Sequence, residues 1–311
     1  MNHTGEIIAI LSAVSCTATA LYASEASSRL GTMTVNVLRL AMATLFLAAA
    51  LWITTGFPYP AAADGKVWFY LALSALVGYV FGDWCLFNSY LVIGPKIGQL
   101  FMTLAPPISA VTGWLLLGEQ MSWKAWLAMA VTISGIAISI MSREEGSHIR
   151  LSIPLKGILL GIGAGMGQGI GLVLSKIGMA HYSSVLPADT PEAIRSMIPF
   201  ASTMARAMIG CIGFLLLMTM QKGLGKLREA AKDRKGLKYA ALTTLFGPVI
   251  GVSLSLMSVQ YTETGIASTL MSLTPVLIII PYALIYRQKI SLKEIIGVTV
   301  SMAGTALFFL L

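Results

Sequence analysis

One acidic residue, Asp83, stands in the middle of a long apolar run, within Gly82-Asp83-Trp84. An ionisable side chain at membrane depth is costly, so it usually binds a substrate, carries a proton or pairs with another charge. Asp83 is therefore a candidate to bind a substrate ammonium or to shuttle a proton. The alternative is a structural pair with Arg39 or with backbone groups.

Prolines interrupt two other apolar runs, at Pro106-Pro107 and at Pro275 and Pro281. Proline removes a backbone donor and kinks a helix, and inside a bilayer the freed carbonyls need a protein or water partner. Interrupted helices at matching positions of two halves are the best sequence indication of a transporter's binding site. We therefore predict a gating or binding role for these prolines, with passive kinks as the alternative. The candidate polar and aromatic residues for substrate binding or coupling are Asp83, Trp84, Asn88, Gln99, Thr103, Gln168, Tyr261, Ser268, Ser272 and Tyr282.

The sequence offers no metal-binding or enzymatic pattern. The three cysteines are isolated inside apolar runs, and no CxxC or HExxH motif is present. The glycine-rich stretch 157–171 does not satisfy G-x-G-x-x-G, so a dinucleotide cofactor is not expected. An intramembrane enzyme would need a paired nucleophile and base at membrane depth, which we do not find. We expect no catalytic residues, cofactor or metal.

The composition requires a membrane. Of 311 residues, 56% are hydrophobic and only 11% are charged, against about 25% charged in soluble domains. Charge-free gaps of roughly 17–24 residues recur along the chain, which is the length a helix needs to cross the bilayer. Three further spans fit if Arg39, Asp83 and Arg206 are tolerated inside them. We predict an all-α polytopic membrane protein with ten transmembrane helices.

The second half of the chain repeats the first. At an offset of 169, residues 64–141 align with 233–310 without a gap, and Asp64 meets Asp233 while Pro106 meets Pro275. Arg39 and Arg206 match with a two-residue shift, whereas Asp83 meets Val252. Five helices in each half is an odd number, so the second repeat must be inverted relative to the first, as in many secondary transporters. The predicted repeats are 1–143 and 152–311.

Two features of the spans have structural interpretations. Glycines between Gly157 and Gly171 recur every four residues on two faces, which predicts close approach of neighbouring helices. Gln168 is the polar exception there. Arg39 and Arg206 are expected to be structural, or to face the lipid and reach the headgroups with their long side chains.

The pattern Gln99-x-x-Met-Thr-Leu-Ala-Pro-Pro, followed by Leu117-Gly118-Glu119 and Ser134-Gly135, resembles the EamA family of the drug/metabolite transporter (DMT) superfamily. The second half repeats it as Ser272-Leu273-Thr274-Pro275 and Ala303-Gly304. The resemblance implies a cavity lined mainly by the first, third, fourth, sixth, eighth and ninth spans, with the fifth and tenth peripheral. One departure is Arg287-Gln288 at the position where the first half has Gly118-Glu119.

Basic residues favour one face. The run 222–238 gathers several of the 21 lysines and arginines, whereas the opposite face has only Lys66, Lys124 and Arg195. Because basic residues favour the cytoplasm, this bias predicts both termini outside, whereas the resemblance implies both inside. The run 222–238 is expected to contact anionic lipid rather than nucleic acid.

We therefore expect a secondary transporter in the cell (inner or plasma) membrane, as a monomer or homodimer. It would export or exchange small metabolites, amino acids or related amphipathic solutes, by alternating access. A lipid flippase-like protein and a non-transport membrane scaffold are the alternatives.

Overall fold

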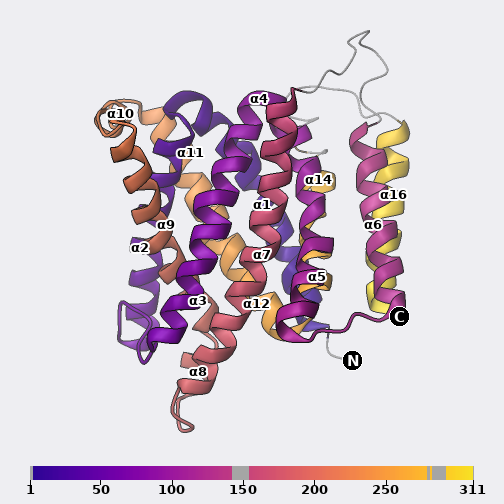
Figure 1. The fold of residues 1–311 in the computed structure, drawn as a ribbon, viewed down its shortest axis with the longest axis horizontal. Helices are drawn as coiled ribbons and strands as arrows, with labels where there is room; N and C mark the ends of the chain where they lie inside the picture. The colour runs from indigo at the N-terminus through magenta and orange to yellow at the C-terminus, as the bar shows by residue number, and fades with distance from the viewer. Residues whose placement is uncertain (1–2, 142–153, 279–280, 282–291, 311) are drawn as a thin grey trace.

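A computed structural model describes residues 3–141, 154–278, 281 and 292–310. Within those ranges every regular element is a helix, and the helices lie side by side in one bundle (Figure 1). The chain is therefore all-α, as the composition predicted. Tyr282 and the Arg287-Gln288 departure lie outside the described residues.

Five spans make up the first half. Gly94, with φ 77° and ψ 159°, reverses the chain inside α4, so the third span ends there and the fourth begins. The elements of this half are α1 (Thr4–Leu30), α2 (Thr32–Thr55), α3 (Gly65–Ala75), the π-helix η1 (Leu76–Asp83), α4 (Trp84–Phe101), the 3₁₀ turn η2 (Met102–Leu104), α5 (Ala105–Leu117) and α6 (Trp123–Met141).

The second half follows the same plan, with a short helix added in each of two connections. Its elements are α7 (Leu155–Val185), α8 (Glu192–Arg195), α9 (Ile198–Met220), α10 (Gly225–Ala230), α11 (Arg234–Thr244), the π-helix η4 (Leu245–Val252), α12 (Ser253–Tyr261), α13 (Thr264–Met271), α14 (Thr274–Leu277) and α16 (Leu292–Leu310).

The offset of 169 holds for the helix boundaries as well as the sequence. When 169 is added to their residue numbers, the limits of η1, α3 and α6 become those of η4, α11 and α16. Both aspartates of the pair cap a helix: Asp64 accepts a bond from the backbone N–H of Val67, and Asp233 from that of Gly236. The two repeats therefore share local backbone irregularities, which chance hydrophobicity would not reproduce.

The repeats are inverted. At one end of the bundle Glu119, after α5, contacts Lys176 in the second half of α7, and Glu6 at the start of α1 contacts Thr262. At the other end Arg29, late in α1, lies over the ring of Tyr239. Hence α1 begins at the end where α7 finishes, and Figure 1 shows the two helices running in opposite directions. We call these the Glu119 end and the Tyr239 end.

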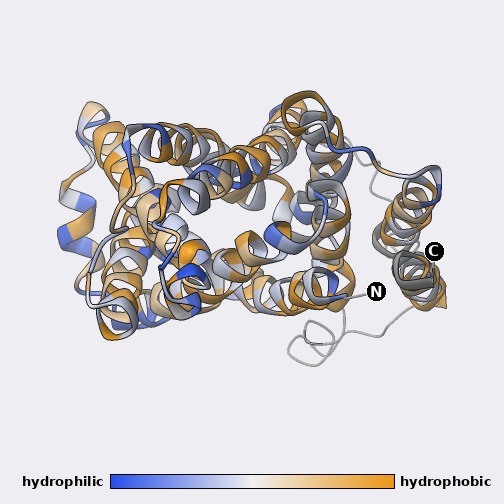
Figure 2. Cartoon of the chain, turned by 90° about the horizontal axis from the view of Figure 1, so that it is seen from below, coloured by the Kyte–Doolittle hydropathy of each residue, from blue (hydrophilic) through white to orange (hydrophobic). Residues whose placement is uncertain are grey.

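The outer surface suits a bilayer. Six described helices are long and apolar enough to cross a membrane, and three shorter apolar helices accompany them. Large apolar side chains are exposed on outward faces, among them Leu45, Ile53 and Trp123. Figure 2 shows the helices coloured mostly from white to orange, with the α6–α16 pair standing to one side. The fifth and tenth spans are peripheral, as the resemblance implied.

Glycines of α7 bring the sixth span against two neighbours, as predicted. A methyl group at Gly167 or Gly171 would meet the backbone of Gly82 or Gly78 in η1. A methyl group at Gly165 or Gly169 would meet the fourth span at Leu104 or Ile108. The two glycine faces therefore pack on the third and fourth spans, and this contact fixes Gln168 between them.

The basic residues divide between the two ends. At the Glu119 end, Lys66 and Lys124 lie near the starts of α3 and α6, and Arg195 ends α8. The run 222–238 lies at the Tyr239 end. The membrane orientation stays a prediction. The expected division after residue 143 and before 152 falls outside the described residues, so the repeat limits 1–143 and 152–311 also stay predictions.

Candidate functional site

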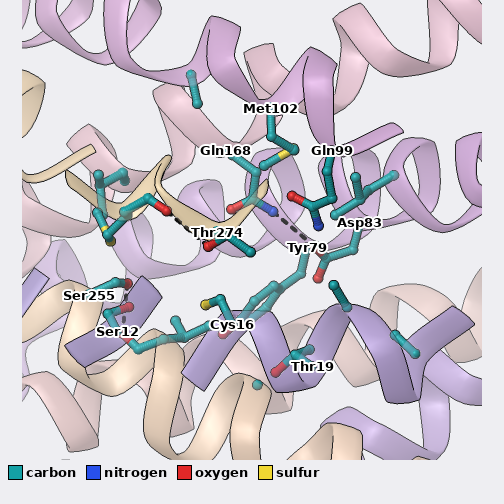
Figure 3. A pocket seen from close by; sticks show the side chains of 18 of the residues that line it. Ser12, Cys16, Thr19, Tyr79, Asp83, Gln99, Met102, Gln168, Ser255 and Thr274 are labelled. Atoms are coloured by element: carbon teal, nitrogen blue, oxygen red, sulfur yellow. Dashed lines mark hydrogen bonds between the residues drawn. The ribbon is translucent and has the colours of Figure 1, made fainter. Parts of the chain in front are cut away.

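A cavity of about 170 Å³ lies in the interior of the bundle. Cys16 and Gln168 line it close to the midpoints of α1 and α7, so the cavity is near the middle of the spans. Residues from both repeats contribute, as Figure 3 shows. The lining comprises Ser12, Cys16, Thr19, Ala20, Ala23, Arg39, Tyr79, Asp83, Leu86, Phe87, Tyr90, Gln99, Met102, Ala105, Gln168, Leu172, Arg206, Gly247, Val252, Ser255, Ser268, Met271, Ser272 and Thr274.

Asp83 is the acidic centre of this cavity. It is the last residue of η1 and is 4% exposed. One carboxylate oxygen pairs with the Arg39 guanidinium, and the other accepts a 2.9 Å bond from the Gln168 amide. A buried charge is stable only when it is paired and hydrogen-bonded. Both interpretations of Asp83 thus remain open, because a residue paired with Arg39 also borders the cavity.

Arg39 and Arg206 were expected to be structural or to face the lipid, and this structure places neither of them at the lipid-facing surface. Each is 4% exposed and lines the cavity. The Arg39 guanidinium lies 4.9 Å from the centroid of the Phe87 ring, within the range of a cation–π contact. The acid and the aromatic ring in the third span therefore hold this arginine inside the bundle, so the second and seventh spans also contribute to the cavity.

Arg206 differs from Arg39 in its partners. Its guanidinium lies 4.6 Å from the centroid of the Tyr79 ring. Its Nε and the Tyr79 hydroxyl are both buried without a hydrogen-bond partner in the described ranges. Arg39, Asp83 and Arg206 are the charged residues among those that line the cavity, so the lining carries one more formal positive charge than negative.

The two proline interruptions meet at this cavity. In the fourth span, η2 breaks the helix directly before Pro106-Pro107, and Met102 and Ala105 line the cavity. In the ninth span, α13 ends at Met271 and α14 begins at Thr274, before Pro275. The cavity is therefore bounded by matching helix breaks from the two repeats. Pro281 is described, whereas residues 282–291 are not.

Half of the predicted binding residues line the cavity, namely Asp83, Gln99, Gln168, Ser268 and Ser272. The amide nitrogen of Gln99 donates a 2.5 Å hydrogen bond to the Tyr90 hydroxyl. Four others lie elsewhere. Asn88 donates to the Trp84 carbonyl, Trp84 packs in the core, Thr103 is buried outside the lining, and Tyr261 is 53% exposed at the Glu119 end. Whether any of the ten binds a substrate stays a prediction.

Sequence reasoning missed the cavity position of Tyr79, Cys16, Arg39 and Arg206. The available signal was the match between the two arginines, because a charge kept in the same span of both repeats has the same place in each. Tyr79 gave no signal of its own, since its counterpart at offset 169 is Pro248.

A second polar cluster joins the repeats at the Glu119 end. Glu119 accepts a 2.6 Å bond from the Lys176 ammonium, and its other oxygen accepts bonds from the backbone and hydroxyl of Thr264. Burial raises the pKa of Glu119, but these bonds outweigh it and leave the pKa below its ordinary value. Burial and then the Glu119 charge raise the pKa of nearby Glu263. The cluster therefore links the ends of the fourth, sixth and ninth spans.

Inverted repeats, broken helices and a charged cavity at mid-depth define a polytopic membrane protein with an architecture that is found in many transporters. Residues 3–141 and 190–310 match the model of the EamA-like transporter family, and the chain belongs to that family.

Two further proteins are similar. The putative permease-like protein YdzE of Bacillus subtilis (strain 168) is 30% identical over 54 residues, which cover 17% of this chain and 69% of that protein. A crystal structure of another protein aligns over 100% of this chain and 98% of its own, with a TM-score of 0.72 and 16% identity. At that identity the likeness shows the fold alone.

Proposed function

We propose that the protein is a secondary transporter that exports or exchanges small metabolites, amino acids or related amphipathic solutes, by alternating access in the cell membrane. The observation that carries the proposal is the cavity at mid-depth, where the broken helices of both repeats meet beside Asp83. Its lining mixes charged and amide groups with apolar side chains such as Leu172 and Met271, which suits a solute with a polar head and an apolar body.

Asp83 is the proposed coupling or binding group. Its carboxylate holds Arg39 and Gln168 from two other spans. Protonation of Asp83, or a substrate ammonium beside it, weakens its hold on Arg39, so occupancy of the cavity and the packing of the second span become linked. A ligand shifts such an equilibrium only through its different affinity for the two states.

Counterflow in proteoliposomes with a metabolite panel tests this function. We expect Asp83→Asn to abolish proton-linked uptake. Asp189→Asn, in the exposed connection between α7 and α8, is the matched control and should transport like the wild type. Full activity of Asp83→Asn would refute the role of Asp83. Absence of counterflow for every solute, together with lipid scrambling, would favour the flippase alternative.

The run 222–238 is the proposed lipid contact. Its basic residues are all exposed at the Tyr239 end, among them Lys222, Arg228 and Lys238. Each basic residue near an anionic surface contributes about 1 kcal/mol of attraction. Uptake rates that do not change with the phosphatidylserine content of the liposomes would contradict this contact. The monomeric or dimeric state is a separate proposal, which cross-linking in the membrane tests.

A further inference from the structure

The arginines of the two repeats occupy matching places, but only Arg39 forms an ion pair among the described residues. Arg39 in the second span pairs with Asp83 at the end of η1. Arg206 is the matching residue of the seventh span, and the position that matches Asp83 is Val252 at the end of η4. Val252 lines the same cavity, and α9 packs against η4. The symmetry of the fold thus provides a place for a second carboxylate, which the sequence leaves empty.

Arg206 has a buried N–H donor without an acceptor among the described residues. A guanidinium has five N–H donors, and the Nε of this one is buried without a hydrogen-bond partner in the described part of the chain. Asp83 interacts with it only through space, because its carboxylate is already paired with Arg39. It is 4% exposed, and the Tyr79 hydroxyl beside it is buried without a partner. An unpaired charge in a low-dielectric interior is strongly unfavourable. A ligand that brings an anion therefore meets two groups that the protein does not satisfy.

The charge balance indicates which anion fits. The lining carries two arginines and one aspartate, so a single negative charge neutralises it when Asp83 is ionised. A carboxylate has one charge and matches the planar guanidinium with two parallel bonds. A phosphate monoester carries about −1.5 to −2 at pH 7 and would exceed the balance. The apolar part of the ligand then lies against side chains such as Leu172 and Met271.

From these observations we infer that the substrate carries a carboxylate, which binds Arg206 and the Tyr79 hydroxyl in the place of the missing acid at position 252. This inference rests on the proposed transport function and names the class of its substrate. Tyr79 donates its hydroxyl to one carboxylate oxygen while the guanidinium donates to the other. Arg39 stays with Asp83, so the two arginines have separate tasks.

Val252→Asp supplies the missing carboxylate internally, and Val252→Asn is its neutral, isosteric control. We expect Val252→Asp to unfold at a higher temperature than Val252→Asn in the same detergent without ligand, because only the former pairs with Arg206. If the two variants unfold together, or if Val252→Asp is the less stable, the inference is overturned. This comparison needs no knowledge of the substrate.

Three probes with the same branched chain test the ligand itself: leucine, 4-methylpentanoate and leucinamide. We expect the two carboxylates to stabilise the wild type against heating at equal ionic strength, and leucinamide not to. Val252→Asp and Arg206→Gln should bind the carboxylates about 30-fold more weakly or worse. The first variant occupies the Arg206 guanidinium with an internal carboxylate, and the second removes the guanidinium charge. Val252→Asn should bind them more strongly than Val252→Asp, and Arg206→Lys should bind with intermediate strength. Asp189→Asn, outside the cavity, should bind them like the wild type.

The outcomes separate this inference from the transport proposal. Equal stabilisation by leucinamide, no stabilisation by either carboxylate, or unchanged binding in Val252→Asp would overturn the carboxylate site. Carboxylate binding with the expected variant pattern but no counterflow would overturn transport and leave the site standing. Counterflow of a solute without a carboxylate would overturn the carboxylate site and leave the transport proposal standing.

Discussion

Replacing Glu119 by Gln tests whether the cluster at the Glu119 end holds the two repeats together. Glu119 follows the fourth span, whereas Lys176 and Thr264 belong to the sixth and ninth. The substitution keeps the shape of the side chain but removes its charge. The Lys176 ammonium then loses its anionic partner, and one of the two oxygens that accept from Lys176 and Thr264 becomes an N–H donor.

The size of the effect follows from burial. Breaking a fully buried ion pair costs about 3–5 kcal/mol. Here the side chains of Lys176 and Glu119 are 21% and 13% exposed, so water can solvate the unpaired ammonium and reduce the cost. We expect Glu119→Gln to lower the free energy of unfolding by about 2–3 kcal/mol. Glu25→Gln breaks a pair with Arg29 in which the two side chains are 40% and 37% exposed, so it should change the free energy of unfolding far less.

The pH dependence gives a second signature. The pKa of Glu119 is lower in the folded protein than the ordinary value of 4.5. The contribution of the Glu119 charge to the free energy of unfolding is therefore fully present above pH 4.5. It is lost as the pH falls through the pKa that Glu119 has in the folded protein. The difference in unfolding free energy between the wild type and Glu119→Gln should shrink below pH 4.5.

Reversible unfolding by SDS in mixed micelles, monitored at pH 7 and at several lower values, measures both effects. A cost for Glu119→Gln no larger than that of Glu25→Gln would refute the reasoning. So would a difference that stays constant down to pH 3, because the charge of Glu119 would then contribute nothing.

Two more predictions concern packing and access. Gly167→Ala should lower the free energy of unfolding by about 1–3 kcal/mol, because the added methyl group meets the Gly82 backbone. Gly65→Ala is the control and should be nearly neutral, because its methyl group meets open space. The same SDS titration compares the two variants. Cys16 lines the cavity, while Cys85 and Cys211 do not, so a small polar thiol reagent should label Cys16 first and a bound carboxylate should slow that reaction, as mass spectrometry of the labelled protein would show. Labelling of Cys211 ahead of Cys16 would contradict this cavity.

The span count, the repeat and the inversion could all be predicted from the sequence, because each depends on a property of many residues at once. Charge spacing sets helix length, and matched residues such as Asp64 and Asp233 set the register. The same offset gives the limits of α6 and α16 to the residue. The π-helices had no signal in the sequence, although each contains a glycine, Gly82 or Gly251, that packs closely on a neighbouring helix.

The site was harder to predict, because a residue lines the cavity only if its side chain points into it. Asn88 lies five residues after Asp83 in the same span, yet it turns back to the Trp84 carbonyl instead of entering the cavity. Arg39 suggested a lipid-facing charge by its position alone. Its burial follows from Asp83 and Phe87, which come from another span and are not visible in the local sequence.

Duplication produces a symmetric frame, but a transporter needs a site that binds its substrate in one preferred way. In this chain the frame stays symmetric in its caps, its π-helices and its arginines, and the asymmetry is concentrated in a few cavity residues. At the offset of 169, Asp83 corresponds to Val252, and Tyr79 corresponds to Pro248. One repeat thus retains a complete ion pair, while the other keeps only the cation. On the carboxylate proposal, a cavity with one internal acid and two arginines would orient an anionic head toward Arg206, because Arg39 is already paired with Asp83.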